Sequence, residues 1–158
     1  MNNGRGVKAF WALLLATAWC FGAYAKPNFS GTWKLNLEKS EYGPMPAPTS
    51  MVDKIAHEDP SLKINRNQAG QQGELNYDLN FTTDGKESTN TIRGNSMKST
   101  VSWEGETLVF DSKLSIQDNE ITFKDKWTVS PDGKTITINR HAASAQGEID
   151  QKLVMEKQ

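Results

Sequence analysis

The feature that most constrains the fold is a period-two alternation of apolar and polar residues, which recurs from residue 29 to the end of the chain. Its clearest run, at 74–81, reads ELNYDLNF. This period is that of a β-strand with one dry face and one wet face. The runs predict about ten strands, at 31–36, 51–58, 62–67, 74–81, 87–92, 96–103, 107–115, 120–129, 134–140 and 148–156.

Short, glycine-containing turns separate most of these runs. The segments at 84–85, 104–105 and 130–133 each place an acidic residue beside or close to a glycine, which supplies the positive φ of tight hairpin turns. Parallel strands would need crossovers of a dozen or more residues, so consecutive strands must pair antiparallel. We therefore predict an all-β fold, a single antiparallel up-and-down barrel of about eight to ten strands whose closure removes its edges. An open sandwich is the alternative.

The first connection, at 37–50, differs from the others because it contains Pro44, Pro46 and Pro48. Prolines at alternate positions remove backbone donors and favour an extended conformation. We predict a crossing loop with at most one helical turn, at 37–40.

The turn positions also predict which residues face each other across neighbouring strands. The expected pairs are Leu79 with Asn90, Tyr77 with Ile92, Val101 with Phe110, Ser99 with Ser112, Trp127 with Ile136, and Asp125 with Ile138.

The inward face defined by this register is strongly aromatic but also carries polar side chains. Its expected apolar members are Trp33, Leu35, Leu62, Ile64, Leu75, Tyr77, Leu79, Phe81, Met97, Val101, Trp103, Leu108, Phe110, Leu114, Ile121, Phe123, Trp127, Val129, Ile136, Ile138, Ile149, Leu153 and Met155. Its expected polar members are Arg66, Asn90, Ser99, Ser112, Asp125, Arg140 and Gln151.

Polar groups inside a barrel are costly when they are dry and unpaired, and a barrel of more than about eight strands has room for water or a ligand. The polar set therefore indicates a hollow lumen, unless its members lie at the rim or satisfy one another. Arg140 is expected diagonal to Asp125, within reach of a long guanidinium. This pair is either a structural ion pair or an anchor for a ligand.

Residues 1–25 have the layout of a secretory signal: a basic start, an apolar stretch at 9–21 and the small-residue triplet Ala23-Tyr24-Ala25. Cleavage between Ala25 and Lys26 would give a secreted or periplasmic protein with one lipocalin-like barrel domain at 26–158. Lipidation at Cys20 is the weaker alternative. Since Cys20 is the only cysteine, removal of the signal leaves no disulfide or thiol chemistry.

Several classes of partner are disfavoured. The net charge is −1 with no basic cluster, which argues against nucleic acid, and the apolar stretch at 9–21 is too short for stable membrane insertion. His57 and His141 are the only histidines and neither lies at metal-ligand spacing from Cys, Asp or Glu, so we expect no metal and no cofactor. We expect a monomer.

Three short segments resemble calycins, the lipocalins and fatty-acid-binding proteins. FSGTWKL at 29–35 is similar to the first calycin strand, and WEGETL at 103–108 and VMEK at 154–157 are similar to late segments of fatty-acid-binding proteins. The chain is also similar to small exported bacterial lipocalin-like proteins. The resemblance implies a calycin-like barrel. The chain departs from the family where a helical lid would follow the first strand, and where the carboxylate clamp would fall on Leu153 and Met155. The lipocalin disulfide is impossible here.

Three functions remain open. The leading hypothesis is an exported barrel that binds a small, mostly apolar molecule. Its expected ligand-binding residues are Trp33, Tyr77, Phe81, Trp103, Asp125, Trp127 and Arg140. The second is an envelope interaction module, a packed barrel without a ligand whose rim contacts an envelope protein. The third is an enzyme that uses Asp125 as general base, although no Gly-x-Ser-x-Gly motif is present.

Overall fold

The computed structural model describes residues 25–158, so the predicted signal segment up to Tyr24, Cys20 included, lies outside the described residues. The described part contains strands and loops but no helix. The strands are β1 Gly31–Leu35, β2 Ser50–Glu58, β3 Ser61–Gly70, β4 Gly73–Thr82, β5 Glu87–Ile92, β6 Asn95–Glu104, β7 Thr107–Ile116, β8 Asn119–Val129, β9 Thr135–Ser144 and β10 Gly147–Lys157.

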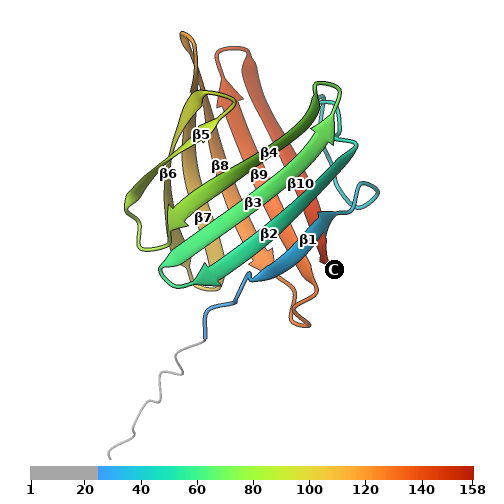
Figure 1. Ribbon diagram of the computed structural model, residues 1–158, viewed down its shortest axis with the longest axis vertical. Coiled ribbons are helices and arrows are strands. Elements are labelled where there is room, and N and C mark those ends of the chain that lie inside the picture. Colours follow the sequence, from blue (N-terminus) through green and yellow to red (C-terminus); the bar gives the residue numbers. More distant parts are fainter. Residues whose placement is uncertain (1–24) are drawn as a thin grey trace, which may run out of the picture.

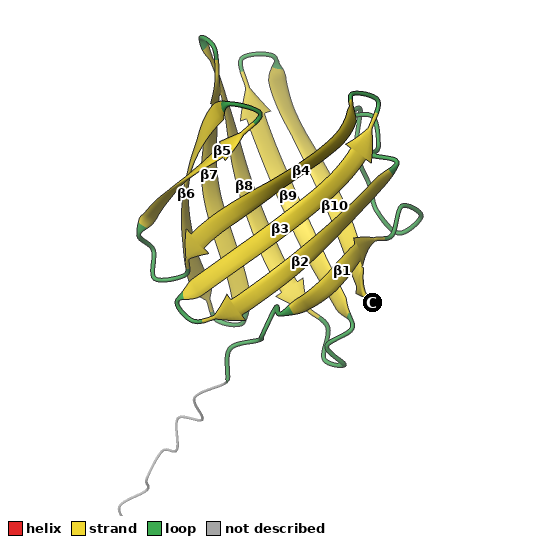
Figure 2. Ribbon diagram, viewed as in Figure 1, coloured by secondary structure: helices red, strands yellow, loops and turns green. Residues whose placement is uncertain are grey.

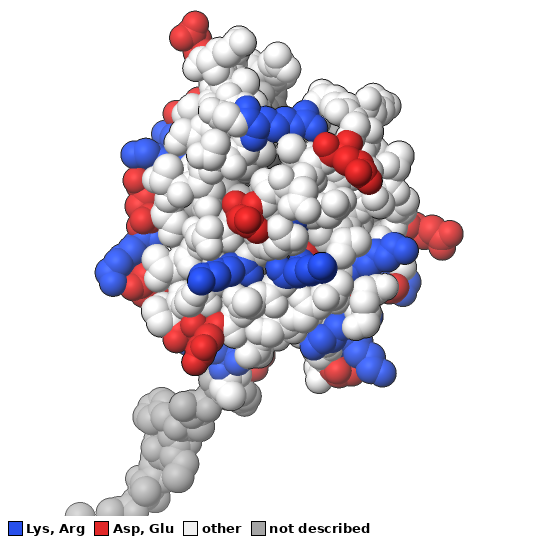
Figure 3. Space-filling view, in the orientation of Figure 1, with Lys and Arg blue, Asp and Glu red and all other residues white. Residues whose placement is uncertain are grey.

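The ten strands form one antiparallel sheet that curls into a barrel (Figures 1 and 2). Their order is β4-β3-β2-β1-β10-β9-β8-β7-β6-β5, so β1 joins the first and last parts of the chain by pairing with both β2 and β10. The predicted all-β up-and-down barrel is confirmed, and the open sandwich is not formed. The predicted removal of edges is incomplete, because β4 and β5 remain the two edges of the sheet. Positive and negative side chains are interspersed on the outer face formed by β1–β4, as expected for the wet side of amphipathic strands (Figure 3).

The register agrees with the prediction at one hairpin and differs at another. Val101 faces Phe110 across β6 and β7, as expected from a loop at 105–106. Between β8 and β9 the predicted register is wrong by two residues, because Trp127 faces Ile138 and Asp125 faces Arg140. The loop there is longer than predicted: it spans 130–134 and closes with a hydrogen bond from the Ser130 N–H to the Thr135 carbonyl, 2.8 Å. A two-residue shift keeps every side chain on its predicted face.

The predicted pairing of β4 with β5, Leu79 with Asn90 and Tyr77 with Ile92, is wrong. No backbone ladder joins these strands, and β4 and β5 are the two ends of the sheet. The turn between them bends toward β6, where the Gly85 N–H donates to the Val101 carbonyl at 2.9 Å. The Asn90 side chain spans the gap instead, accepting from the Asn80 N–H at 2.7 Å and donating to the Asn80 carbonyl at 3.0 Å.

The proline-containing first connection crosses one end of the barrel without a helix, as predicted. It is tied to β10 by a two-way backbone bridge between Glu41 and Lys152, with N···O distances of 2.7 and 2.9 Å. Its tip, at 45–48, therefore remains over the interior.

The two ends of the barrel differ in packing. The opposite end, where residues 25–30 enter the barrel in Figure 1, is filled by fully buried side chains that include Phe29, Trp33, Leu62 and Leu108. The end under the proline loop is hollow. We call the packed end the floor of the barrel. The other half of the barrel encloses a cavity.

Candidate ligand-binding site

A cavity of about 520 Å³ occupies the upper half of the barrel. Its mouth lies between three segments: the tip of the proline loop at 45–48, the β3–β4 turn at 70–73, and the β5–β6 turn near Arg93. Gln72 and Arg93 hydrogen-bond to each other across the two turns. The volume is in the range of small-molecule sites in proteins.

Most of the cavity wall is apolar, because most inward positions of β3, β4, β6, β7 and β8 are aliphatic or aromatic. Phe81, Phe110 and Trp127 form an aromatic cluster, with ring centroids 5.4 Å apart for Phe81–Phe110 and 4.8 Å apart for Phe110–Trp127. Other wall residues are Ile64, Leu75, Leu79, Met97, Leu114 and Phe123. Such a surface favours an apolar ligand body.

Asp125 and Arg140 form a bidentate ion pair on the wall made by β8 and β9. The Arg140 Nε and Nη2 atoms donate to the two carboxylate oxygens of Asp125 at 2.8 and 2.6 Å. Burial by itself lowers the pKa of Arg140, but the charge and hydrogen bonds of Asp125 outweigh it and raise that pKa. The expected contact is thus present, and it is direct rather than diagonal because of the shifted register.

A second pair, Asp53–Arg66, lies on the wall made by β2 and β3. Arg66 Nε and Nη2 donate to the two Asp53 oxygens, both at 2.7 Å, and the Asp53 side chain is 1% exposed. Burial lowers the pKa of Arg66, yet the charge of Asp53 and its hydrogen bonds raise it well above its usual range. Tyr77 faces Arg66 across β3 and β4.

The predicted inward position of Arg66 is correct, but its partner Asp53 was not predicted, because no residue of β2 was assigned to the inward face. The sequence does contain the pattern that would have identified this partner. At every second position β2 carries Met51, Asp53, Ile55 and His57, and all four are buried. An aspartate in the middle of an inward apolar row predicts a buried cationic partner.

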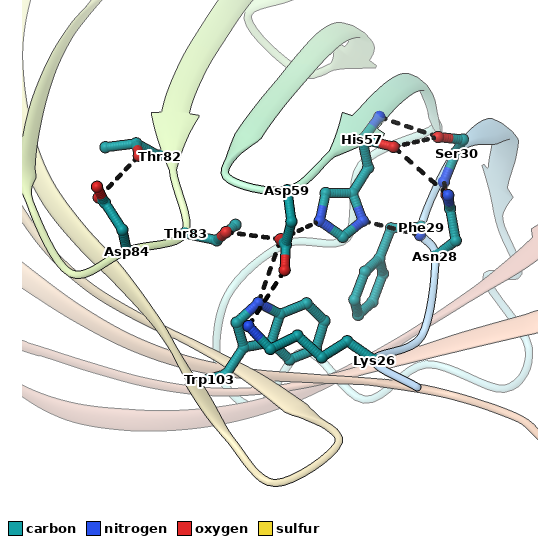
Figure 4. A network of polar contacts seen from close by, with 10 residues as sticks. All are labelled: Lys26, Asn28, Phe29, Ser30, His57, Asp59, Thr82, Thr83, Asp84 and Trp103. Atoms are coloured by element: carbon teal, nitrogen blue, oxygen red, sulfur yellow. Dashed lines mark hydrogen bonds and ion pairs between the residues drawn. The ribbon is translucent and has the colours of Figure 1, made fainter. Parts of the chain in front are cut away.

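The structure brings five of the seven predicted ligand-binding residues to the cavity: Tyr77, Phe81, Asp125, Trp127 and Arg140. Trp33 and Trp103 do not line it. The Trp33 indole N–H donates to the Phe29 carbonyl at 2.8 Å, in the packed floor. The Trp103 indole N–H points to Asp59 at 3.3 Å, beside the same floor (Figure 4).

A polar network holds the floor in place (Figure 4). His57 Nδ1 accepts from the Phe29 N–H at 3.2 Å, so its Nε2 carries the proton and donates to Asp59 at 2.9 Å. Because both ring nitrogens are occupied, His57 is a structural residue rather than a free base. Asp59 also accepts from Thr83 and Lys26. Burial raises the pKa of Asp59, but the donors around it lower that pKa far more.

Within residues 25–158, no group of three or more His, Cys, Asp or Glu side chains is placed to hold a metal ion. The same residues contain no helix that is long and apolar enough to cross a membrane.

Several solved structures share this architecture but are distant in sequence. A secretory abundant heat soluble protein from Ramazzottius varieornatus superposes with a TM-score of 0.57 and 15% identity, covering 85% of this chain and 98% of that one. The zebrafish ileal bile acid-binding protein, in complex with cholic acid, gives a TM-score of 0.58, 21% identity and coverage of 82% and 98%. The fluorescent protein UnaG gives a TM-score of 0.57 and 16% identity, covering 82% of this chain and 97% of that one. The barrel is calycin-like. No protein-family model and no curated protein sequence matches the chain.

Proposed function

We propose that this protein is an exported barrel that binds a small, mostly apolar molecule in its lumen. The observation that carries the proposal is the cavity of about 520 Å³, which has an aromatic and aliphatic wall and an open mouth. The fold gives independent support, because a calycin-like neighbour holds cholic acid in its solved structure. Phe81 and Trp127 would contact the ligand body, and Tyr77, Arg140 and Asp125 would orient its polar end.

The cavity argues against the packed-barrel interaction module, whose interior should be filled. The geometry also disfavours Asp125 as a general base. Both of its oxygens already accept hydrogen bonds from Arg140, so a substrate would have to compete with a buried ion pair for this carboxylate.

Binding can be tested by filling the cavity. Nile red, an uncharged lipophilic dye, should bind the wild-type protein and quench its tryptophan emission. Leu114→Trp places a large side chain in the cavity and should weaken dye binding at least about tenfold. Lys113→Trp adds the same side chain to the exposed face of the same strand and should leave binding unchanged. Equal effects of the two variants, or no dye binding by folded wild-type protein, would contradict the proposal.

Export is proposed from the signal-like residues 1–25. Intact-mass analysis of protein made in its own host should give a chain that begins at Lys26. A product that keeps Trp11, or one lipidated at Cys20, would contradict soluble export.

A further inference from the structure

Four charged side chains of the lumen form two ion pairs, and their charges add up to zero. Arg66 and Arg140 are the guanidinium groups within the walls, and each is held by a buried aspartate through two hydrogen bonds. Asp53 and Asp125 thus leave the interior with no net charge from these four side chains. The remaining cation of the lining, Arg93, lies at the mouth, where it bonds to Gln72.

The groups left for a ligand are chiefly hydrogen-bond donors. A guanidinium has five N–H groups, and each pair uses the Nε and one Nη2 hydrogen, so Arg66 and Arg140 both keep N–H groups for further acceptors. Trp127 lines the cavity, but its indole N–H is shielded from the cavity and has no partner within the described residues, so it is not counted among these donors.

A carboxylate fits this arrangement poorly. It would lose its hydration on burial. It would also add a negative charge beside two Asp–Arg pairs in which each arginine is already neutralised by its aspartate. A neutral carbonyl, ester or ether oxygen accepts the same hydrogen bonds with a much smaller loss of hydration. The lumen therefore discriminates by charge as well as by shape.

We propose that the ligand is an uncharged amphiphile with an apolar body and acceptor oxygens, which bind the free N–H groups of Arg66 and Arg140, and that ionised fatty acids are disfavoured. This inference rests on the proposed function of the lumen as a binding site. It follows from two charge-compensated arginines on facing parts of one cavity.

The first test compares two ligands of equal chain length in displacing Nile red at pH 8. Methyl dodecanoate, which is neutral, should displace the dye at a concentration at least about tenfold lower than dodecanoate, which is ionised at this pH. Equal displacement, stronger displacement by dodecanoate, or no displacement by either would overturn the inference. Failure of Nile red itself to bind would overturn the proposed function, so the two failures are distinguishable.

The second test reverses the preference. Asp125→Asn keeps the shape of the side chain but leaves Arg140 uncompensated, so dodecanoate should gain about tenfold in affinity while methyl dodecanoate changes much less. Asp111→Asn is the matched control, because it makes the same change of charge on the outer face of β7, beside Lys124. An equal gain in both variants, or no gain in folded Asp125→Asn protein, would overturn the inference. Should Asp125→Asn not fold, the wild-type comparison decides alone.

Discussion

Two buried Asp–Arg pairs lie on facing parts of the barrel wall, and they differ in exposure. The Asp53 and Arg66 side chains are 1% and 9% exposed, whereas Asp125 and Arg140 are 8% and 22% exposed. Burying both charges has a desolvation cost that the attraction offsets only while both partners are present. Each pair therefore makes the barrel sensitive to the loss of either partner.

We expect Arg66→Leu to lower the free energy of unfolding by about 3–5 kcal/mol, because it leaves Asp53 buried and unpaired. Replacing both residues with leucine should cost much less. Urea denaturation of the two single variants and the double variant measures the coupling. Additive losses would show that the two side chains do not depend on each other.

A pH dependence follows from Asp59 in the barrel floor. Burial raises its pKa, but hydrogen bonds from Thr83, His57, Lys26 and Trp103 lower it, and the net pKa lies well below the usual range. A carboxyl whose folded pKa is lowered stabilises the fold above its unfolded pKa, and this contribution is lost as the pH falls through the folded pKa. Wild-type protein should therefore exceed Asp59→Asn in stability at pH 7, and the difference should shrink between about pH 5 and pH 2.

Chemical denaturation of both proteins across this pH range checks the prediction. Asp84→Asn is the control: hydrogen bonds from Lys86 and Thr82 lower the pKa of Asp84 to about 2, which is a smaller shift than that of Asp59. Its effect on stability should therefore be smaller. A difference between wild type and Asp59→Asn that stays constant with pH would contradict the assignment.

At the scale of elements, the junction of β4 and β5 is the weak point of the sheet. Every other neighbouring pair of strands shares a backbone ladder, whereas these two are connected by the side chain of Asn90 bonded to the backbone of Asn80. Asn90 is buried, so water cannot readily replace these bonds.

Asn90→Ala should destabilise the protein by about 1–3 kcal/mol, because it leaves the Asn80 N–H and carbonyl without partners. Amide hydrogen exchange should also become faster at Asn80. Thr91→Ala, which changes the exposed face of the same strand, is the control and should affect neither quantity. Unchanged exchange at Asn80 would mean that another contact closes the junction.

At the scale of the whole molecule, the segment before β1 completes the floor of the barrel. Phe29 is fully buried and packs against His57, Trp103 and Trp127, with ring centroids 5.7, 6.0 and 6.1 Å away. Its N–H and carbonyl bond to His57 and Trp33. A residue that belongs to no strand therefore helps to close the barrel at this end.

A chain that begins at Lys26 should be more stable than one that begins at Gly31. The shorter chain lacks the burial of Phe29, and loss of a buried phenylalanine costs about 3–5 kcal/mol. Phe29→Ala in the longer chain should account for most of the difference. Thermal or urea unfolding of the three proteins measures it, and equal stabilities would show that the floor is held by the strands alone.

Strand content and the orientation of most side chains could be predicted from the sequence. Alternation at 74–81 and in the other runs identified ten strands, and turns such as the one at 105–106 predicted register where the loop length was right. The candidate site was predictable in part. Tyr77, Phe81 and Trp127 were assigned inward positions and do line the cavity.

The side of the sheet on which each residue lies follows from the sequence alone, because a period of two depends only on local backbone geometry. The position of each residue along the barrel axis, from floor to mouth, depends on the tertiary structure. Trp33 and Trp127 both face inward, yet one lies in the floor and the other on the cavity wall. Depth depends on loop lengths and on the stagger between strands far apart in the chain. The same interactions placed Arg140 directly opposite Asp125, left β4 and β5 unpaired, and brought the two ion pairs to one lumen.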